Sequence, residues 1–315
     1  MFNNYNNNPV LYTDMISSLK KINREKKNIL SSKEYRVGNS LIKNRNKLKE
    51  EGIGAFFSIL DNYKRFKKGK SYSMASYIKK SEVKRSSDYF NDDRIAVYTC
   101  IIGNYDQLQE PLFCPDNCDF YAITDFNIPP NSCWKRIDVR DYESEVSQFN
   151  SVMTNRYFKF HPEKLFRDYK YSVYVDGNIR IYTDMTEYIN RIAYYGLATF
   201  SHSQRNCVYK EAEACIAMGK AEHNSITEQI QYIRNQKMPE QYGLPTCCII
   251  AREHNQESCI KLMDSWWEEF LRFPYRDQLS FPFALFKNKV EISKITVLGE
   301  NVFEDDSFEF VNHIK

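Results

Sequence analysis

Residues 171–179 read Tyr-Ser-Val-Tyr-Val-Asp-Gly-Asn-Ile, and this stretch decides the fold prediction. Its alternating aromatic and β-branched residues favour a buried strand, and Gly177 permits the sharp bend that ends it. Asp176 and Asn178 are therefore expected at the carboxyl end of a strand, where open α/β sheets bind ligands. Two hard oxygen ligands at this spacing suit Mg²⁺ or Mn²⁺ in contact with phosphate oxygens. The alternative is a strand that simply ends in a polar turn.

The sequence on both sides of this strand, over residues 94–315, predicts further strands that alternate with helices. Apolar runs predict the other strands at residues 95–102, 119–124, 134–139, 197–200, 246–251 and 291–298. Helices are predicted at residues 150–166, 183–193, 207–219, 223–236, 256–272 and 277–287. This alternation predicts an α/β domain with a mostly parallel sheet covered by helices. The glycine-rich fingerprints of dinucleotide and P-loop sites do not occur in the sequence.

The first 93 residues have a different character from the rest of the chain. Residues 1–90 hold 20 Lys and Arg against 8 Asp and Glu, whereas residues 91–315 hold 24 against 33. We predict a disordered, Asn-rich start over residues 1–13, interrupted basic helices over residues 14–70, and a polar linker over residues 71–93. These helices would self-associate, pack on the main domain or contact an anionic membrane surface. A solvated helix face is an equally weighted alternative.

The cysteines and the hydropathy pattern predict a cellular location. Nine cysteines show no repeated spacing, and Cys114 and Cys118 have no second pair at zinc-ligand distance. No disulfide framework is therefore expected. No apolar run reaches the roughly 18 residues of a membrane span. With an odd cysteine count and no signal peptide, the prediction is a cytoplasmic protein, with the inner face of the membrane as a peripheral site.

Polar residues that follow the predicted strands are candidates for binding a nucleotide. The turn after the first strand suits contact with a base or ribose, and it comprises Gly103, Asn104, Tyr105 and Asp106. Asp125, which ends the second strand, is expected beside it. Arg156 and Lys159 are three residues apart on a predicted helix, so they share a face and could both reach a diphosphate. Ordinary surface cations are the alternative for these two residues.

Five segments in this order resemble a family of glycosyltransferases of the GT-A type, which includes plant Golgi proteins linked to cell-wall polysaccharide and bacterial proteins of surface-polysaccharide clusters. The segments are YTCIIGNYDQLQEP (98–111), FYAITD (120–125), NRYFKFHPEKLFRDYKYSVYVDGNI (155–179), HSQRNCVYKEAEACI (202–216) and SWWEEFLRFPYRDQLSFPFALFK (265–287). The resemblance implies a GT-A fold, a nucleotide-sugar donor, a glycan acceptor, and Mn²⁺ or Mg²⁺ bound through Asp176 and Asn178. Asn178 stands where many GT-A enzymes have a second Asp.

Sugar transfer needs further groups, for which the sequence offers candidates. Asp277 is the first candidate for a catalytic residue that contacts the sugar or the acceptor, and Glu211 is the second. Asp277 could instead only stabilise the start of a helix. Gln278, next to Asp277, is expected to contact the donor. His202 and His313 are candidates for a third metal ligand.

Two other functions remain open from the sequence. One is a metal-dependent hydrolase of the lipid-amidase type, because some plant relatives in the resembled family carry that assignment. A His-Glu-x-x-His motif, which would favour such an enzyme, does not occur in the sequence. The other is a non-catalytic protein that binds sugar nucleotides or a partner. Nucleic acid is not expected as a partner, because aromatic and basic residues are only sparsely interleaved in the first 90 residues.

Overall fold

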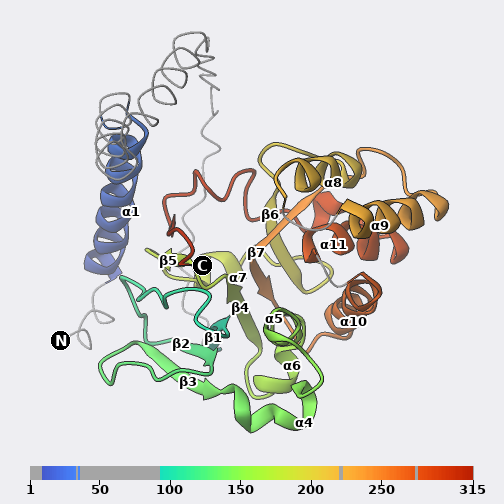
Figure 1. Cartoon of the computed structure of the whole chain (residues 1–315). Coiled ribbons are helices and arrows are strands. Elements are labelled where there is room, and N and C mark those ends of the chain that lie inside the picture. The colour runs from blue at the N-terminus through green and yellow to red at the C-terminus, as the bar shows by residue number, and fades with distance from the viewer. Residues whose placement is uncertain (1–8, 33–34, 36–92, 220–222, 274–275, 315) are drawn as a thin grey trace, which may run out of the picture. The chain divides into compact units, whose positions relative to one another are not determined.

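The computed structural model of the chain describes residues 9–32, 35, 93–219, 223–273 and 276–314 (Figure 1). The chain divides into two compact units, one comprising Met1–Lys20 with Tyr89–Lys315 and the other Lys21–Asp88. None of the described helices is both long enough and apolar enough to cross a membrane.

Helix α1 (Pro9–Ser31) is the described part of the basic N-terminal region. It begins at Pro9, so the prediction of disorder over residues 1–13 is wrong for residues 9–13. Proline is favoured in the first turn of a helix. The Nζ of Lys20 lies 2.7 Å from the Glu187 carboxylate. The helices and the linker predicted between residues 36 and 92 lie outside the described residues.

The main unit is built on a six-stranded sheet in the order β3-β2-β1-β4-β7-β6. Its strands are β1 (Ile95–Ile101), β2 (Cys118–Thr124), β3 (Trp134–Asp138), β4 (Tyr171–Val175), β6 (Leu197–Ser201) and β7 (Pro245–Arg252). The β1–β2, β1–β4 and β2–β3 pairs are parallel, whereas β7 is antiparallel to both β4 and β6. Only β7 therefore runs against the other strands. The predicted α/β class with a mostly parallel sheet and covering helices is confirmed.

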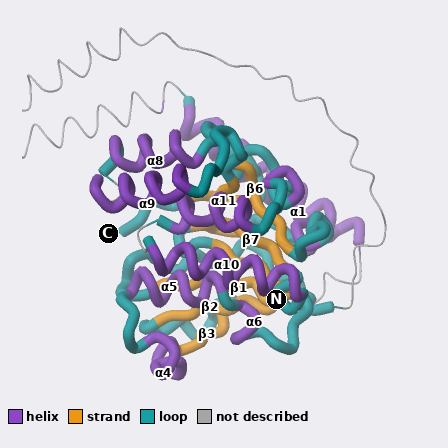
Figure 2. The backbone as a smooth tube through the Cα atoms, turned by 90° about the vertical axis from the view of Figure 1, so that its right-hand side faces the viewer, coloured by secondary structure: helices purple, strands orange, loops and turns teal. Residues whose placement is uncertain are grey.

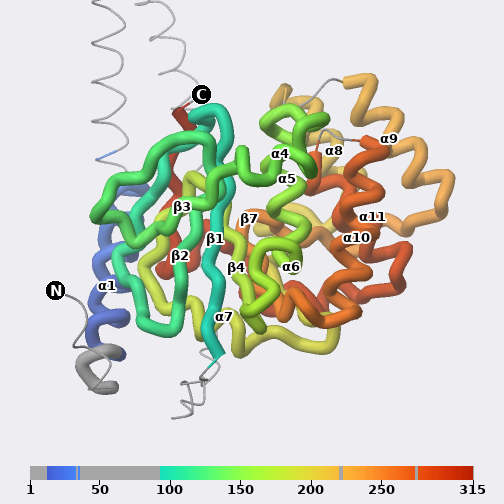
Figure 3. Tube along the Cα trace, turned by 90° about the horizontal axis from the view of Figure 1, so that it is seen from below, coloured from blue at the N-terminus to red at the C-terminus, as the bar shows by residue number. Residues whose placement is uncertain are grey.

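Helices cover one face of this sheet. The helices of the main unit are α4 (Glu143–Val146), α5 (Ser151–Phe160), α6 (Pro162–Leu165), α7 (Thr186–Ile189), α8 (Val208–Ala217), α9 (His223–Asn235), α10 (Glu257–Arg272) and α11 (Asp277–Lys287). Figure 2 shows α5, α10 and α11 in front of the strands, and Figure 3 shows them on one side of β1 and β4. Tyr98, Tyr174 and Trp266 belong to the apolar core between these helices and the sheet.

The opposite face of the sheet packs against a smaller layer. Val97 and Val173 alternate with Tyr98 and Tyr174 along their strands, so they point to this second face. The layer contains helix α7 and a two-stranded sheet of β5 (Ile179–Ile181) and β8 (Phe308–Phe310). Burial on both faces explains why the central strands read as continuous apolar runs.

Three predicted elements differ in the structure. The helix predicted over residues 150–166 is two helices, because Pro162 has no N–H to continue the first one. The helix predicted over residues 183–193 is reduced to α7. The strand predicted over residues 291–298 is wrong: it contains the 3₁₀ helix η2 (Ile292–Lys294) and bonds to β6 only around Thr199. Its buried residues are Ile292, Ile295 and Leu298, whose spacing of three does not fit the alternation of a strand.

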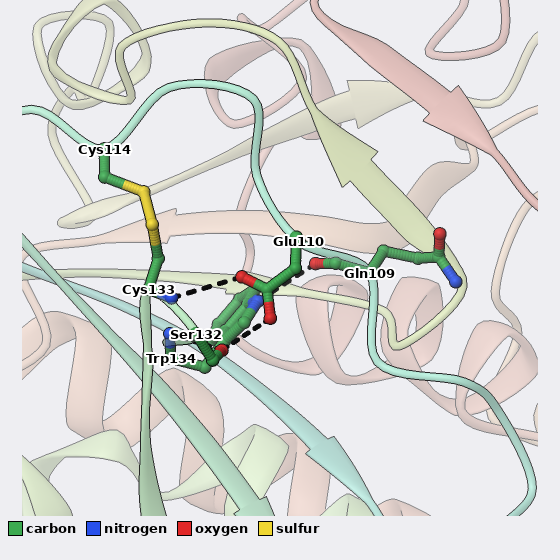
Figure 4. Close-up of a disulfide and its surroundings, with 6 residues drawn as sticks. All are labelled: Gln109, Glu110, Cys114, Ser132, Cys133 and Trp134. Carbon is green, nitrogen blue, oxygen red and sulfur yellow. Dashed lines mark hydrogen bonds between the residues drawn. A yellow bond between two sulfur atoms is a disulfide. The ribbon is translucent and has the colours of Figure 1, made fainter. Parts of the chain in front are cut away.

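A disulfide joins Cys114, in the connection between β1 and β2, to Cys133, in the connection between β2 and β3 (Figure 4). The same two connections are linked by hydrogen bonds. Glu110 accepts from Ser132 Oγ at 2.5 Å and from the Cys133 N–H at 3.2 Å. Trp134 Nε1 donates to the Gln109 carbonyl at 2.9 Å. This single disulfide was not predicted, because a pair 19 residues apart leaves no recognisable spacing in the sequence.

Candidate functional site

A cavity of about 450 Å³, here called the first cavity, lies at the carboxyl ends of β1 and β4. Strand order reverses between β1 and β4, and open α/β sheets bind ligands at this kind of position. Most of the predicted site residues line the first cavity: Tyr105, Asp106, Arg156, Lys159, Asp176, Asn178, Asp277, Gln278 and His313.

The end of β4 delivers Asp176 to this cavity. The Asp176 N–H donates to the Cys248 carbonyl at 2.9 Å, which pairs this position with β7. Its side chain is 35% exposed. A Cβ at Gly177 would lie 2.6 Å from Ile101 Cγ1 and 3.3 Å from an Asp106 carboxylate oxygen. Only glycine therefore lets the end of β4 approach the end of β1 this closely.

Three ionised side chains form a buried cluster on the floor of the first cavity. Asp277 Oδ2 lies 2.8 Å from Lys159 Nζ and 3.0 Å from Arg156 Nε. Lys159 Nζ also lies 3.6 Å from Asp176 Oδ1, so its ammonium group bridges two carboxylates. Arg156 and Lys159 share a helix face, as predicted, but that face meets Asp277 at the first position of α11.

The charges in this cluster stabilise one another. Burial alone would raise the pKa of Asp277, but Arg156, Lys159 and Arg276 outweigh it, so the pKa lies well below its usual range. Burial alone would lower the pKa of Lys159, but Asp176 and Asp277 raise it above its ordinary value. All three members therefore stay ionised around neutral pH. Asp277 is held as a counter-ion, and it does not cap α11 because the N-cap position belongs to Arg276.

The position of Lys159 is fixed by its own helix and its neighbours. Helix α5 starts at an effective cap, because the Asn150 side chain accepts from the Met153 N–H at 2.9 Å. The Lys159 carbonyl accepts from the buried Arg252 guanidinium at 2.8 Å, and its Nζ lies 4.9 Å from the centre of the Tyr174 ring. The ammonium group therefore has little freedom to leave the cavity floor.

The C-terminal segment forms part of the cavity wall. Val311 is bonded to Asn178 twice: its N–H donates to the Asn178 carbonyl at 2.8 Å, and its carbonyl accepts from Asn178 Nδ2 at 3.0 Å. His313 Nδ1 lies 2.6 Å from Asp106 Oδ1, and its ring centre lies 5.1 Å from that of Tyr105. This segment therefore brings His313 to the turn that was predicted to bind the nucleotide.

Three predicted residues around this turn do not line the cavity. The Gly103 N–H donates to the Asp125 carboxylate at 3.0 and 3.2 Å, and Asn104 adopts a left-handed φ of 52°. These contacts shape the turn that carries Tyr105 and Asp106. Direct contact of Gly103, Asn104 and Asp125 with a nucleotide stays a prediction.

His202 and Glu211 lie away from the first cavity. The Glu211 carboxylate is buried and accepts from Arg205 Nε at 2.5 Å, with His202 Nε2 at 3.5 Å. The Gln204 and Arg205 N–H groups both donate to His202 Nδ1 at 3.2 Å, so the neutral imidazole carries its proton on Nε2. The second cavity, of about 400 Å³, is lined by Ser201, His202, Arg205, Asn206, Tyr242, Gly243, Leu244, Glu291, Ile292, Ser293 and Thr296.

Other residues that line the first cavity were not predicted from the sequence. Arg276 precedes Asp277, and Asn155 donates from Nδ2 to the Cys100 carbonyl at 2.5 Å. Thr246, Cys247 and Cys248 come from the amino end of β7. Because β7 is antiparallel, its amino end lies at the carboxyl ends of its neighbours, and an apolar strand gives no sign of that direction.

The donor atoms around Asp176 fit a hard divalent cation with few protein ligands. Asp176 offers a partly exposed carboxylate, and Asn178 offers Oδ1 because its Nδ2 already donates to Val311. In the described part of the chain, no three His, Cys, Asp or Glu side chains converge on one point as a metal cage. Mg²⁺ characteristically binds one or two carboxylates together with water and substrate phosphate oxygens.

Known proteins with similar sequences place this arrangement in a family. Residues 132–313 match the family described as "TOD1/MUCI70, glycosyltransferase-like domain". The "Probable hexosyltransferase MUCI70" of Arabidopsis thaliana is 32% identical over 133 residues. The match covers 38% of this chain and 22% of the plant protein, so the chain spans only a small part of that relative.

Two solved structures show a weaker likeness. The WbbM bifunctional glycosyltransferase in its apo form gives a TM-score of 0.40 at 14% identity, covering 66% of this chain and 39% of that one. Mouse xyloside xylosyltransferase 1 in its apo form gives a TM-score of 0.36 at 7% identity, covering 64% of this chain and 83% of that one. The family match, by contrast, runs over more than half of the 315 residues and includes Asp176, Asp277 and His313. The chain therefore belongs to the TOD1/MUCI70 family of glycosyltransferase-like domains.

Proposed function

We propose that this protein transfers a sugar from a nucleoside-diphosphate sugar to a glycan acceptor, with a divalent cation at Asp176. The observation that carries the proposal is the partly exposed Asp176 carboxylate, which shares one cavity with Arg156 and Lys159. A diphosphate needs this combination of cationic groups and a metal-binding carboxylate. Membership of the family and the hexosyltransferase name of the plant relative support the proposal.

The chain's own residues supply positions and charges for this reaction. Asp106, Tyr105 and His313 border the side of the cavity where the nucleotide would bind. Asp277 holds Arg156 and Lys159 on the floor, where both cations face a departing diphosphate. When bound at Asp176 and Asn178, Mn²⁺ or Mg²⁺ would neutralise further charge on that leaving group. Direct contact of Asp277 with the sugar or acceptor stays a prediction.

The proposed step exchanges one bond of the sugar for another. The bond between the anomeric carbon and the diphosphate oxygen breaks, and the nucleoside diphosphate leaves with the electron pair. A bond forms between that carbon and an acceptor hydroxyl oxygen, whose proton is released to solvent.

A donor screen tests this function directly. The full chain would be heated with UDP- and GDP-hexoses, with and without Mn²⁺, because a ligand that binds only the folded state raises the melting temperature. We expect a shift with at least one donor that depends on Mn²⁺, followed by slow hydrolysis of that donor. The absence of any nucleotide-dependent shift and of any hydrolysis would overturn the proposal.

A further inference from the structure

The second cavity lies next to the first along strand β7. Leu244 lines the second cavity and Thr246 lines the first, and only Pro245 separates them in the chain. Two residues of extended chain span at most about 7 Å. Gln278, in the first cavity, donates from Nε2 to the Pro245 carbonyl. A molecule bound in the second cavity could therefore reach the edge of the first.

Backbone hydrogen bonds hold the walls of the second cavity together. The His202 N–H donates to the Leu244 carbonyl at 2.8 Å, and the Gly243 N–H donates to the Asn206 carbonyl at 2.9 Å. Gly243 has a φ of +113°, and a Cβ there would lie 3.0 Å from Ile292. These three chain segments are thus closely fitted before any ligand binds, which lowers the ordering cost of binding.

The lining of the second cavity combines apolar and polar groups without an excess of positive charge. Its neutral polar groups are the hydroxyls of Ser201, Tyr242, Ser293 and Thr296 and the amide of Asn206. The Arg205 charge is balanced by the buried Glu211 carboxylate at 2.5 Å, and Glu291 adds a negative charge. The Tyr242 hydroxyl already donates to the Val290 carbonyl at 2.7 Å, and the Thr296 hydroxyl donates to the Ile292 carbonyl at 3.0 Å, so both would accept from a ligand. The other hydroxyls and the amide can both donate and accept, which matches the hydroxyl groups of a sugar. An anionic ligand would instead meet Glu291.

The geometry points to the second cavity as the site of a neutral oligosaccharide acceptor, which extends one hydroxyl past Pro245 and Gln278 into the first cavity. This inference rests on the proposed function, because it names the acceptor of that reaction. Anionic glycans are the competing class.

The test uses the labelled full chain on a printed array of neutral and uronate-containing oligosaccharides. Ser293→Trp would place a large ring at an exposed position of the lining without disturbing the buried core. Ser203→Trp is the matched control, because Ser203 is exposed on a neighbouring segment but does not line the cavity. We expect neutral oligosaccharides to bind the wild type and the control, and Ser293→Trp to weaken that binding at least tenfold. UDP binding by calorimetry should be equal in all three proteins.

Three outcomes would overturn the inference: no neutral oligosaccharide binds, only uronate-containing ones bind, or Ser293→Trp binds as well as the control. These outcomes are separable from failure of the proposed function. Donor hydrolysis without the expected array result would remove the acceptor site alone. The expected array result without any effect of nucleotide sugars would leave a glycan-binding site and remove the transferase.

Discussion

Asp176 is the residue on which the proposed metal chemistry depends. We predict that Asp176→Ala abolishes Mn²⁺-dependent binding of UDP and leaves the fold intact, because the carboxylate is partly exposed and its only described ion-pair partner is Lys159. Calorimetry with UDP and Mn²⁺ measures the effect, with Asp168→Ala as a control at an exposed carboxylate outside the first cavity. Unchanged affinity in Asp176→Ala would remove the metal from this position.

A substitution can show whether Asp277 serves mainly to start helix α11 or mainly as a counter-ion of Lys159 and Arg156. Asparagine supports a helix start about as well as aspartate. However, Asp277→Asn would leave the buried Lys159 and Arg156 without their main counter-charge, so we expect a loss of about 3 kcal/mol in the free energy of unfolding. Urea denaturation measures this loss. The double variant with Lys159→Met should recover part of it, and a loss below about 1 kcal/mol would contradict the counter-ion role.

His254 predicts a pH dependence of stability. Its Nε2 lies 2.8 Å from the Phe166 carbonyl, whereas its buried Nδ1 has no hydrogen-bond partner in the described structure. Burial lowers the pKa of His254 to about 4. The unfolded chain, with a pKa of about 6.5, therefore binds more protons between these values, and stability falls as the pH falls.

His254→Gln should remove this contribution, because glutamine can still donate to Phe166 but does not titrate. We expect the slope of unfolding free energy against pH near pH 5 to decrease by about 1.4 kcal/mol per pH unit relative to the wild type. Urea denaturation between pH 6.5 and 4 gives both slopes. Identical slopes would show that His254 is protonated equally in both states.

At the scale of elements, the central strands were predictable and the small second sheet was not. The apolar runs of β1, β4 and β7 are long enough to be recognised, because both faces of these strands are buried. Strands β5 and β8 have three residues each, which is too short for a periodicity signal. Their pairing, and with it the position of His313, depends on a tertiary contact that a local pattern does not reveal.

The candidate site was predictable in its parts but not in its connections. Strand ends and helix spacing identified Asp176, Arg156 and Lys159, because these signals are local. The ion pair of Lys159 with Asp277 joins residues 118 positions apart, and nothing in either segment indicates the partner. The absence of Glu211 from the lining of the first cavity has the same cause, since its contacts with Arg205 and His202 depend on the turn after β6.

The disulfide between the two connections is predicted to stabilise the fold. Closing a loop of this length, with Cys114 and Cys133 19 residues apart, stabilises a fold by roughly 3 kcal/mol in the chain-entropy treatment. Cys133→Ser should therefore lower the melting temperature to that of the wild type in dithiothreitol, and the variant itself should not respond to dithiothreitol. A wild type that is equally stable with and without dithiothreitol would contradict this role.

For the whole molecule, the division into an accessory region (1–93) and a transferase domain (94–315) stays a prediction. The proposed self-association or membrane contact falls mostly on residues outside the described structure. The cytoplasmic location also stays a prediction. The Cys114–Cys133 bond is less typical of the cytoplasm, because disulfides persist mainly in oxidising compartments.

The contact between Asp106 and His313 has a consequence for the order of folding. The two residues are 207 positions apart, whereas Tyr98 and Tyr174 pair on neighbouring central strands across a much shorter loop. Closing a longer loop costs more entropy and slows the contacts that depend on it. During refolding from urea, we expect the fluorescence of Trp134, Trp266 and Trp267 to recover before UDP binding does. Simultaneous recovery would contradict this order. The refolding chain would then possess a stable sheet for some time before it could retain a nucleotide sugar.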